Sequence, residues 1–155
     1  HAGAGHGAAA RRLIAAGERF DPAAFFETAR QVGHGRALGM RFGDAGDHWT
    51  ELSLPWREEL VGVPESGVLA TGAIVSLIDT ASGTAAWTAI GQFVPLVTLD
   101  LRIDYLRPAL KGETIHARCT CVKLTRRIAF VSGVVHGGDP ARPVAHSAGT
   151  FMLGG

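Results

Sequence analysis

Residues 72–89 read GAIVSLIDTASGTAAWTA, and this stretch decides the fold. Its length suits a helix, but its apolar side chains, among them Ile74, Leu77 and Trp87, point in every direction of a helical projection. A helix with almost no polar face is typical of a protein interior. We therefore predict that this helix lies in the core and that the rest of the chain packs around it.

The chain after this helix predicts a run of strands in quick succession. The clearest is residues 97–106, where apolar and polar residues alternate, which predicts one packed face and one polar face. The apolar set is Val97, Leu99, Leu101, Ile103 and Tyr105, and the polar set is Thr98, Asp100, Arg102 and Asp104. Further strands are predicted at 113–124, 128–136 and 143–153, separated by turn residues.

A buried helix followed by consecutive strands is typical of an α+β fold in which an antiparallel sheet covers one helix. Short turns favour antiparallel neighbours over parallel crossovers. Such a sheet ends in edge strands whose backbone groups need a partner or a cover. We therefore expect a homo-oligomer.

The chain before the helix predicts less structure. Asp21 and Pro22 suit the N-cap and the first position of a short helix that ends by Gly33. Residues 1–19 show no clear periodicity, residues 35–47 are glycine-rich and turn-like, and residues 49–54 alternate as a strand does. These patterns divide the chain into an N-terminal extension, residues 1–34, and one folded domain, residues 35–155.

The composition excludes several classes of protein. With 155 residues, 46% of them hydrophobic, the chain can form one domain with a substantial core. A net charge of +1 gives no broad basic surface for nucleic acid. Cys119 and Cys121 share one face of a predicted strand, where a mutual disulfide is disfavoured, so we expect reduced thiols. Without an apparent signal or membrane span, the expected location is the cytoplasm.

Asp79 lies in the middle of the apolar helix, where a carboxylate is out of place. Asp is almost never fully buried without a partner, and a helix interior offers it no capping role. One interpretation is structural: Asp79 bonds to a neighbouring hydroxyl of Ser76, Thr80 or Ser82, or to a group of a partner chain. The functional interpretation is a nucleophile or general base in a partly desolvated cleft.

A carbonyl attacked by Asp79 would need hydrogen-bond donors for the developing oxyanion. Thr71 and Gly72 begin the helix, and their backbone N–H groups, backed by the helix dipole, are suitable donors. They precede Asp79 by seven or eight residues, about 10–12 Å of helical rise, so one subunit cannot bring both to one carbon. We therefore hypothesise that the amides of one subunit face Asp79 of another.

Two stretches, GVLATGAIVSLIDTASGTAA at 67–86 and VTLDLRIDYLRPALKGE at 97–113, resemble the hotdog-fold thioesterases of the PaaI-like type, and the resemblance extends over roughly residues 49–153. It implies a sheet wrapped around a central helix, a homodimer or homotetramer, and hydrolysis of acyl-CoA thioesters without metal or other cofactor. Asp79 matches the family's helix carboxylate, and Thr98 matches a hydroxyl residue that positions the water or the carboxylate.

The same resemblance suggests residues that contact the substrate. Lys123, Arg126 and Arg127 match a loop that often meets CoA in relatives, and their charge suits phosphates. A solvated hairpin turn explains these basic residues equally well. The family usually has His-Gly-Gly at the helix start, where this chain has Ala70-Thr71-Gly72 and therefore no imidazole. Glu65 or Ser66 is a candidate to replace the missing polar groups.

Other chemistries have weaker support. His116, His136 and His146 have no recognised metal-ligand spacing, even together with the cysteines, and are expected to be core or rim residues. The chain contains neither a Gly-x-Ser-x-Gly elbow nor a phosphate loop. A dehydratase or hydratase of the same fold would need the absent His. A non-catalytic acyl-CoA or small-ligand binding protein is the main alternative, since loss of His-Gly-Gly fits a loss of catalysis.

The acyl group itself is not predicted. Trp87, Phe93 and Leu96 lie near the end of the helix, where they could line an apolar acyl tunnel or belong to the core.

Overall fold

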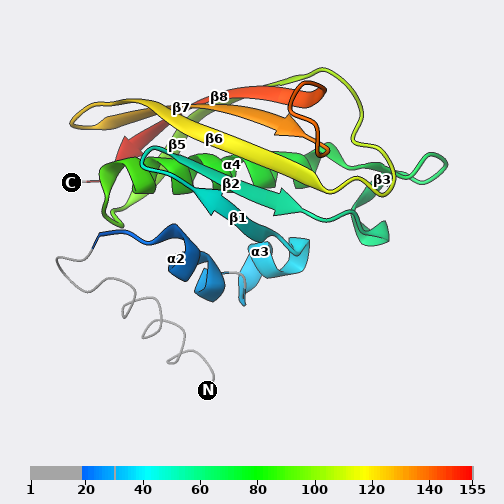
Figure 1. The fold of residues 1–155 in the computed structure, drawn as a ribbon, viewed down its shortest axis with the longest axis horizontal. Coiled ribbons are helices and arrows are strands. Elements are labelled where there is room, and N and C mark those ends of the chain that lie inside the picture. Colours follow the sequence, from blue (N-terminus) through cyan, green and yellow to red (C-terminus); the bar gives the residue numbers. More distant parts are fainter. Residues whose placement is uncertain (1–18, 30, 155) are drawn as a thin grey trace.

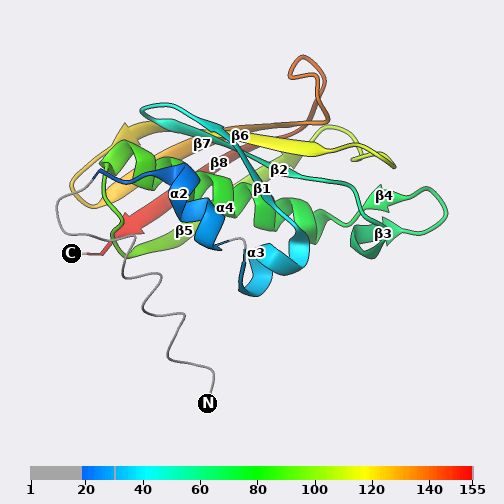
Figure 2. The ribbon, with the colours of Figure 1, turned by 60° about the horizontal axis from the view of Figure 1, so that its bottom comes forward.

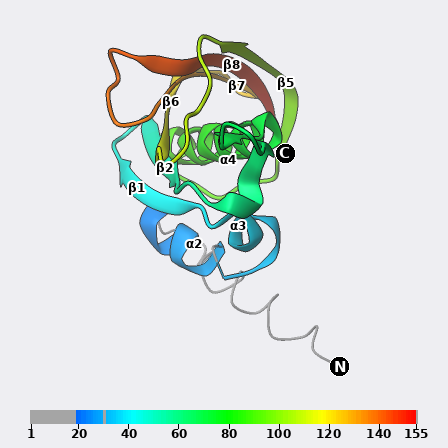
Figure 3. The ribbon, with the colours of Figure 1, turned by 90° about the vertical axis from the view of Figure 1, so that its right-hand side faces the viewer.

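The computed structural model describes residues 19–29 and 31–154. Its main feature is a six-stranded sheet in the order β1-β2-β6-β7-β8-β5, in which every neighbouring pair is antiparallel. The strands are β1 (Arg41–Ala45), β2 (Trp49–Leu54), β5 (Leu96–Tyr105), β6 (Ile115–Leu124), β7 (Ile128–His136) and β8 (Pro143–Leu153). Helix α4 (Thr71–Ile90) lies inside the curl of this sheet, as the end-on view in Figure 3 shows. The predicted α+β hotdog fold, an antiparallel sheet wrapped around a central helix, is confirmed.

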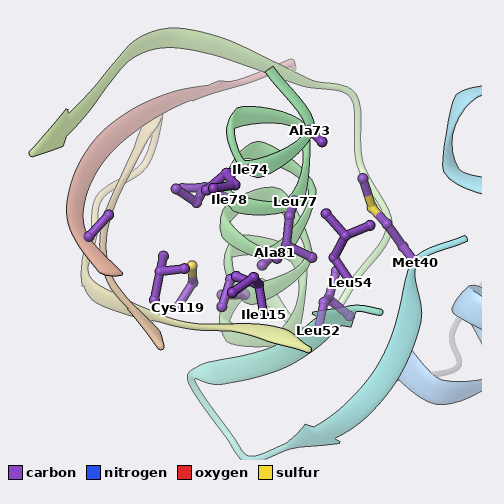
Figure 4. Packing of buried hydrophobic residues seen from close by; sticks show 14 of the residues in the cluster. Met40, Leu52, Leu54, Ala73, Ile74, Leu77, Ile78, Ala81, Ile115 and Cys119 are labelled. Atoms are coloured by element: carbon purple, nitrogen blue, oxygen red, sulfur yellow. The ribbon is translucent and has the colours of Figure 1, made fainter. Parts of the chain in front are cut away.

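Helix α4 supplies the centre of the core. Leu77, Ile78, Ala81 and Ala85 are fully buried, and the strands that contact α4 most are β6, β2 and β7. Figure 4 shows this packing, with Ile115 of β6 close to the helix. Within the part of the chain that the structure describes, α4 is the one helix long and apolar enough to cross a membrane. Of its apolar stretch of 18 residues, however, 61% is buried inside the protein.

The prediction that α4 has almost no polar face and lies wholly in the core is wrong for its first half. Thr71, Gly72 and Val75 are exposed, and Ser76 and Asp79 are half-buried. The reason is that the sheet encloses only part of the helix. Asp79 therefore lies beside an opening and not in a closed core.

Strand β5 is an edge strand, and its register differs from the predicted alternation. A β-bulge between Thr98 and Asp100 shifts the pairing with β8, so that Thr98 lies opposite the buried Phe151. Val97 and Leu99, which were predicted to pack, are each 53% exposed. A bulge adds one residue to a strand and reverses the faces on one side of it. As a result Thr98, predicted to lie on the polar face, points towards α4.

The N-terminal part contains more structure than predicted. Helix α2 (Pro22–Ala29) begins as expected, with Asp21 Oδ1 accepting hydrogen bonds from Ala23 N at 2.9 Å and Ala24 N at 3.1 Å. The supposed turn region holds helix α3 (Gly33–Leu38) and strand β1. Helix α3 ends at Gly39, whose φ of 71° is a left-handed conformation that favours glycine. Tertiary contacts stabilise these short elements, so they can form without a clear apolar period in their sequence.

The loop between β2 and α4 contains a 3₁₀ turn, η1 (Glu58–Leu60), and a small hairpin of β3 (Val61–Val63) and β4 (Val68–Leu69). In Figures 1 and 2 this hairpin projects at the end of the molecule where α4 begins. The division at residue 34 stays a prediction, and residues 1–18 lie outside the described residues.

Candidate active site

A hydrogen bond joins Asp79 of α4 to Thr98 of β5, with Thr98 Oγ1 donating to Asp79 Oδ1 at 2.9 Å. The bulge described above makes this contact possible, since it places the Thr98 side chain on the inner side of the sheet. One oxygen of the carboxylate is thus held in place. Among the residues that the structure describes, none forms a hydrogen bond with Asp79 Oδ2, which can accept a proton or attack an electrophile.

The hydroxyls that could have given Asp79 a purely structural role bond elsewhere. Ser76 Oγ donates to Gly72 O at 3.1 Å, and Thr80 Oγ1 donates to Ser76 O at 2.7 Å. Ser82 Oγ donates to Cys119 Sγ at 3.4 Å. Asp79 is therefore not a carboxylate kept in the helix by its own neighbours.

A cavity of about 310 Å³ opens beside Asp79. Its walls include Phe25 and Ala29 of α2, His34 of α3, Gly83 of α4 and Thr98 of β5. Most of the remaining lining is apolar and includes Trp87 and Leu96. A mostly apolar cavity with a few polar groups at one place is the usual form of a small-molecule site. Its position next to a held carboxylate makes it the candidate active site.

The N-terminal helices form one wall of this cavity, which sequence reasoning missed. His34 Nε2 lies 2.9 Å from Ser76 Oγ and links α3 to α4. No local pattern could have indicated the contact, because the two residues are 42 positions apart.

Of the residues considered for an acyl tunnel, Trp87 and Leu96 do line the cavity. Phe93 belongs to an aromatic cluster instead, with its ring centroid 4.5 Å from that of Trp87 and 5.4 Å from that of Phe25. Phe25 and Trp87 of this cluster line the cavity, Trp87 close to the C-terminus of α4.

The candidate oxyanion donors lie at the other end of the helix. Thr71 and Gly72 are exposed, and a side chain added at Gly72 would meet open space. The N-cap is Ala70, whose side chain makes no capping hydrogen bond. Thr71 and Asp79 are separated by eight residues of one continuous helix, about 12 Å of rise. One subunit therefore does not bring them together.

The predicted substrate-contacting residues are exposed and lie at opposite ends of the subunit. Glu65 and Ser66 are in the β3–β4 hairpin, near the start of α4. Lys123, Arg126 and Arg127 lie at the β6–β7 turn, at the end of the molecule where α4 finishes (Figure 1). Within one subunit the structure joins Asp79 only to Thr98 among the predicted site residues.

His116, His136 and the two cysteines pack in the sheet, whereas His146 is exposed on β8. The rings of His116 and His136 stack with centroids 5.2 Å apart, and burial of His136 lowers its pKa, an effect to which the nearby His116 adds. Burial raises the pKa of Cys119 to about 11, and that of Cys121 is also raised by burial. Among residues 19–29 and 31–154, no group of three or more His, Cys, Asp or Glu side chains could hold a metal ion.

Comparison with known proteins gives the family. The model of the thioesterase superfamily matches residues 66–144. A protein of Halobacterium salinarum is 38% identical over 75% of this chain and 81% of its own length. The medium/long-chain acyl-CoA thioesterase YigI of Escherichia coli is 26% identical over 77% of this chain and 84% of its own.

The solved structures agree on the fold. The PaaI protein of the Escherichia coli phenylacetic acid degradation operon superposes with a TM-score of 0.72 at 19% identity, covering 83% of this chain and 89% of that one. The family match includes the whole of α4 with Asp79, and the strand that carries Thr98. The chain therefore belongs to the thioesterase superfamily, as a thioester hydrolase with the PaaI-like hotdog fold.

Proposed function

We propose that this protein hydrolyses acyl-CoA thioesters to the free acid and CoA, with Asp79 as the nucleophile or the general base. The observation that carries the proposal is the Asp79 carboxylate, held by Thr98 at the edge of an apolar cavity. The acyl group would occupy the cavity, which would leave the thioester carbon near Asp79 Oδ2. The name of the Escherichia coli relative, an acyl-CoA thioesterase, supports CoA as the carrier.

In this proposal the active site is completed by a second subunit. The backbone amides of Thr71 and Gly72 of one subunit would stabilise the oxyanion that forms next to Asp79 of the other. The edge of β5 supports a homodimer, because Val97 and Leu99 are exposed there beside Thr98. A second copy that covers this edge would shield both the apolar side chains and the unpaired strand.

The remaining site residues complete the proposal. Lys123, Arg126 and Arg127 would bind the CoA phosphates, and Glu65 or Ser66 would supply a polar group in place of the missing His.

A homotetramer has support in the exposed apolar side chains of the outer sheet face, which include Phe130, Val134 and Met152. The cytoplasm is the proposed location, which suits the two free cysteines because cytosolic thiols stay reduced.

Release of CoA thiol from short, medium, long and aromatic acyl-CoAs tests the function. We expect turnover by the wild type and a loss on the order of 10²–10⁴ in kcat for Asp79→Asn, the usual contribution of a general base. Thermal unfolding of both proteins controls for the fold. CoA or acyl-CoA binding without turnover by the wild type would instead identify a non-catalytic binding protein.

Complementation between subunits tests the shared site. Thr71→Pro removes one oxyanion donor but suits the helix, because proline is favoured at the first helical position. Ala70 already has φ −62° and ψ 133°, a conformation compatible with a following proline. We expect each single variant to be nearly inactive. In a hybrid dimer, the Thr71→Pro subunit contributes an intact Asp79 and the Asp79→Asn subunit contributes intact amides.

Unfolding and refolding an equal mixture of the two variants should therefore restore activity. Random pairing makes half of the dimers hybrids with one intact site each, so about a quarter of the wild-type activity is expected. A mixture no more active than its components would contradict the shared site, provided that mass spectrometry of tagged chains shows hybrid dimers.

A further inference from the structure

The cavity beside Asp79 lies between α4 and the N-terminal helices, which are joined at two places. At one, His34 of α3 contacts Ser76 of α4 at 2.9 Å. At the other, the rings of Phe25 of α2 and Trp87 of α4 have centroids 5.3 Å apart. Figure 3 shows α2 and α3 on the side of α4 away from β7 and β8. Between the two contacts the helices enclose the cavity.

The part of α4 between these contacts contains a glycine that local structure does not require. Gly83 lies inside the helix, where glycine is less favourable than alanine by roughly 1 kcal/mol. A Cβ atom at Gly83 would meet only Leu96 Cδ2, at 3.6 Å, which is ordinary contact. Space for a side chain therefore exists, and that space belongs to the cavity.

The length of the cavity can be compared with an acyl chain. Asp79 and Trp87 are eight residues apart on α4, about 12 Å of rise, and Gly83 lies about 6 Å from Asp79. An extended chain advances roughly 1.3 Å per bond, since three bonds separate Cα atoms 3.8 Å apart. A chain that starts at Asp79 would pass Gly83 at about its fifth carbon and reach Trp87 at about its tenth.

The volume gives a similar size. A cavity of about 150 Å³ holds one benzene molecule, and 310 Å³ is roughly twice that volume, enough for about twelve carbon atoms. Part of this volume lies around Asp79 and would hold the thioester group. Length and volume together fit a medium-length acyl chain.

We propose that Gly83 determines which acyl groups this enzyme accepts, by leaving room for unbranched chains of about ten carbons between α4 and the α2–α3 wall. The inference rests on the proposed acyl-CoA hydrolysis. Ala29 of α2, which lines the same cavity from the opposite wall, has the same role to a smaller degree.

Filling the cavity tests this assignment. Gly83→Leu and Ala29→Leu each place a side chain in the path of the acyl group, and the control Ala37→Leu adds the same side chain at an exposed position of α3 outside the cavity. The readout is the ratio of kcat/KM for decanoyl-CoA to that for butyryl-CoA. A leucine at position 83 would exclude about five carbons, those beyond the fifth, and each buried methylene contributes about fourfold, so the ratio should fall on the order of 1,000-fold in Gly83→Leu.

The control should keep the wild-type ratio, and Ala29→Leu should lower it by a smaller factor. An unchanged ratio in Gly83→Leu would overturn the proposal. Wild-type protein that releases no CoA from any acyl-CoA would refute the hydrolysis but not the cavity, which decanoate binding tests separately through the change in tryptophan fluorescence, since Trp87 lines the cavity. In that case, equal decanoate affinity of wild type and Gly83→Leu would overturn the assignment of Gly83.

Discussion

Thr98→Val tests how the Asp79 carboxylate is held. The substitution removes the hydroxyl that donates to Asp79 Oδ1 at 2.9 Å and keeps the shape of the side chain. Valine is as favourable as threonine in a strand, so β5 and its pairing with β8 should be retained. The change is therefore limited to one charge-assisted hydrogen bond. Thr98→Ser, which keeps a hydroxyl, is the matched control.

The expected size follows from the type of bond. A hydrogen bond to a charged group contributes roughly 1.5–3 kcal/mol. Asp79 is half-buried and Thr98 is exposed, so water can take the place of part of this interaction. The low end of the range applies, and 1.4 kcal/mol corresponds to about tenfold in rate. We expect Thr98→Val to lower kcat by about tenfold, and Thr98→Ser by less than about threefold.

The assay is CoA release over a range of acyl-CoA concentrations, with kcat and KM determined separately. If Thr98 acts by positioning Asp79, most of the loss should be in kcat. The same substitution in an Asp79→Asn background should then have almost no further effect, because coupled residues are not additive. Wild-type kcat in a folded Thr98→Val protein would refute the positioning role, and so would equal losses in both backgrounds.

Three further predictions concern stability and reactivity. Burial lowers the pKa of His136, so the unfolded chain binds a proton at this residue more readily than the folded chain does. The free energy of unfolding should therefore hold its full value above about pH 6.5 and fall at lower pH. Urea unfolding at pH 7.5 and 5.5 measures this difference, which should be smaller in His136→Gln. The pKa of Glu113 is lowered chiefly by its hydrogen bonds from Arg107, at 2.9 and 3.0 Å, so its contribution is present above about pH 4.5 and is lost as the pH falls below that. Glu113→Gln should lower the free energy of unfolding by about 1–3 kcal/mol at pH 7, and a urea midpoint equal to that of the wild type would contradict this. Cys119 is fully buried with a pKa of about 11, and Cys121 is 8% exposed. Neither thiol should therefore react with a disulfide reagent until the protein is unfolded. Rapid labelling of the native protein would contradict this and show that β6 opens.

The central helix, the strands after it and the short capped helix before it could all be predicted from the sequence. Their signals are local: a long apolar stretch, alternation within each strand, and an N-cap residue followed by proline. Asp79 could be singled out for the same reason, because a carboxylate in an apolar helix conflicts with its neighbours. Because side chains alternate between the two faces of a strand, the placement of Cys119 and Cys121 on one face of β6 could also be predicted.

Only the tertiary structure decided which groups meet. The bulge at Thr98 depends on the pairing of β5 with β8, and without it the hydroxyl would point away from Asp79. The contact between His34 and Ser76, and the cavity at Gly83, exist because α2 and α3 pack against α4 from positions far away in the chain. Local patterns determine elements through their period, whereas a site requires side chains from separate elements at defined distances, which long-range packing alone sets.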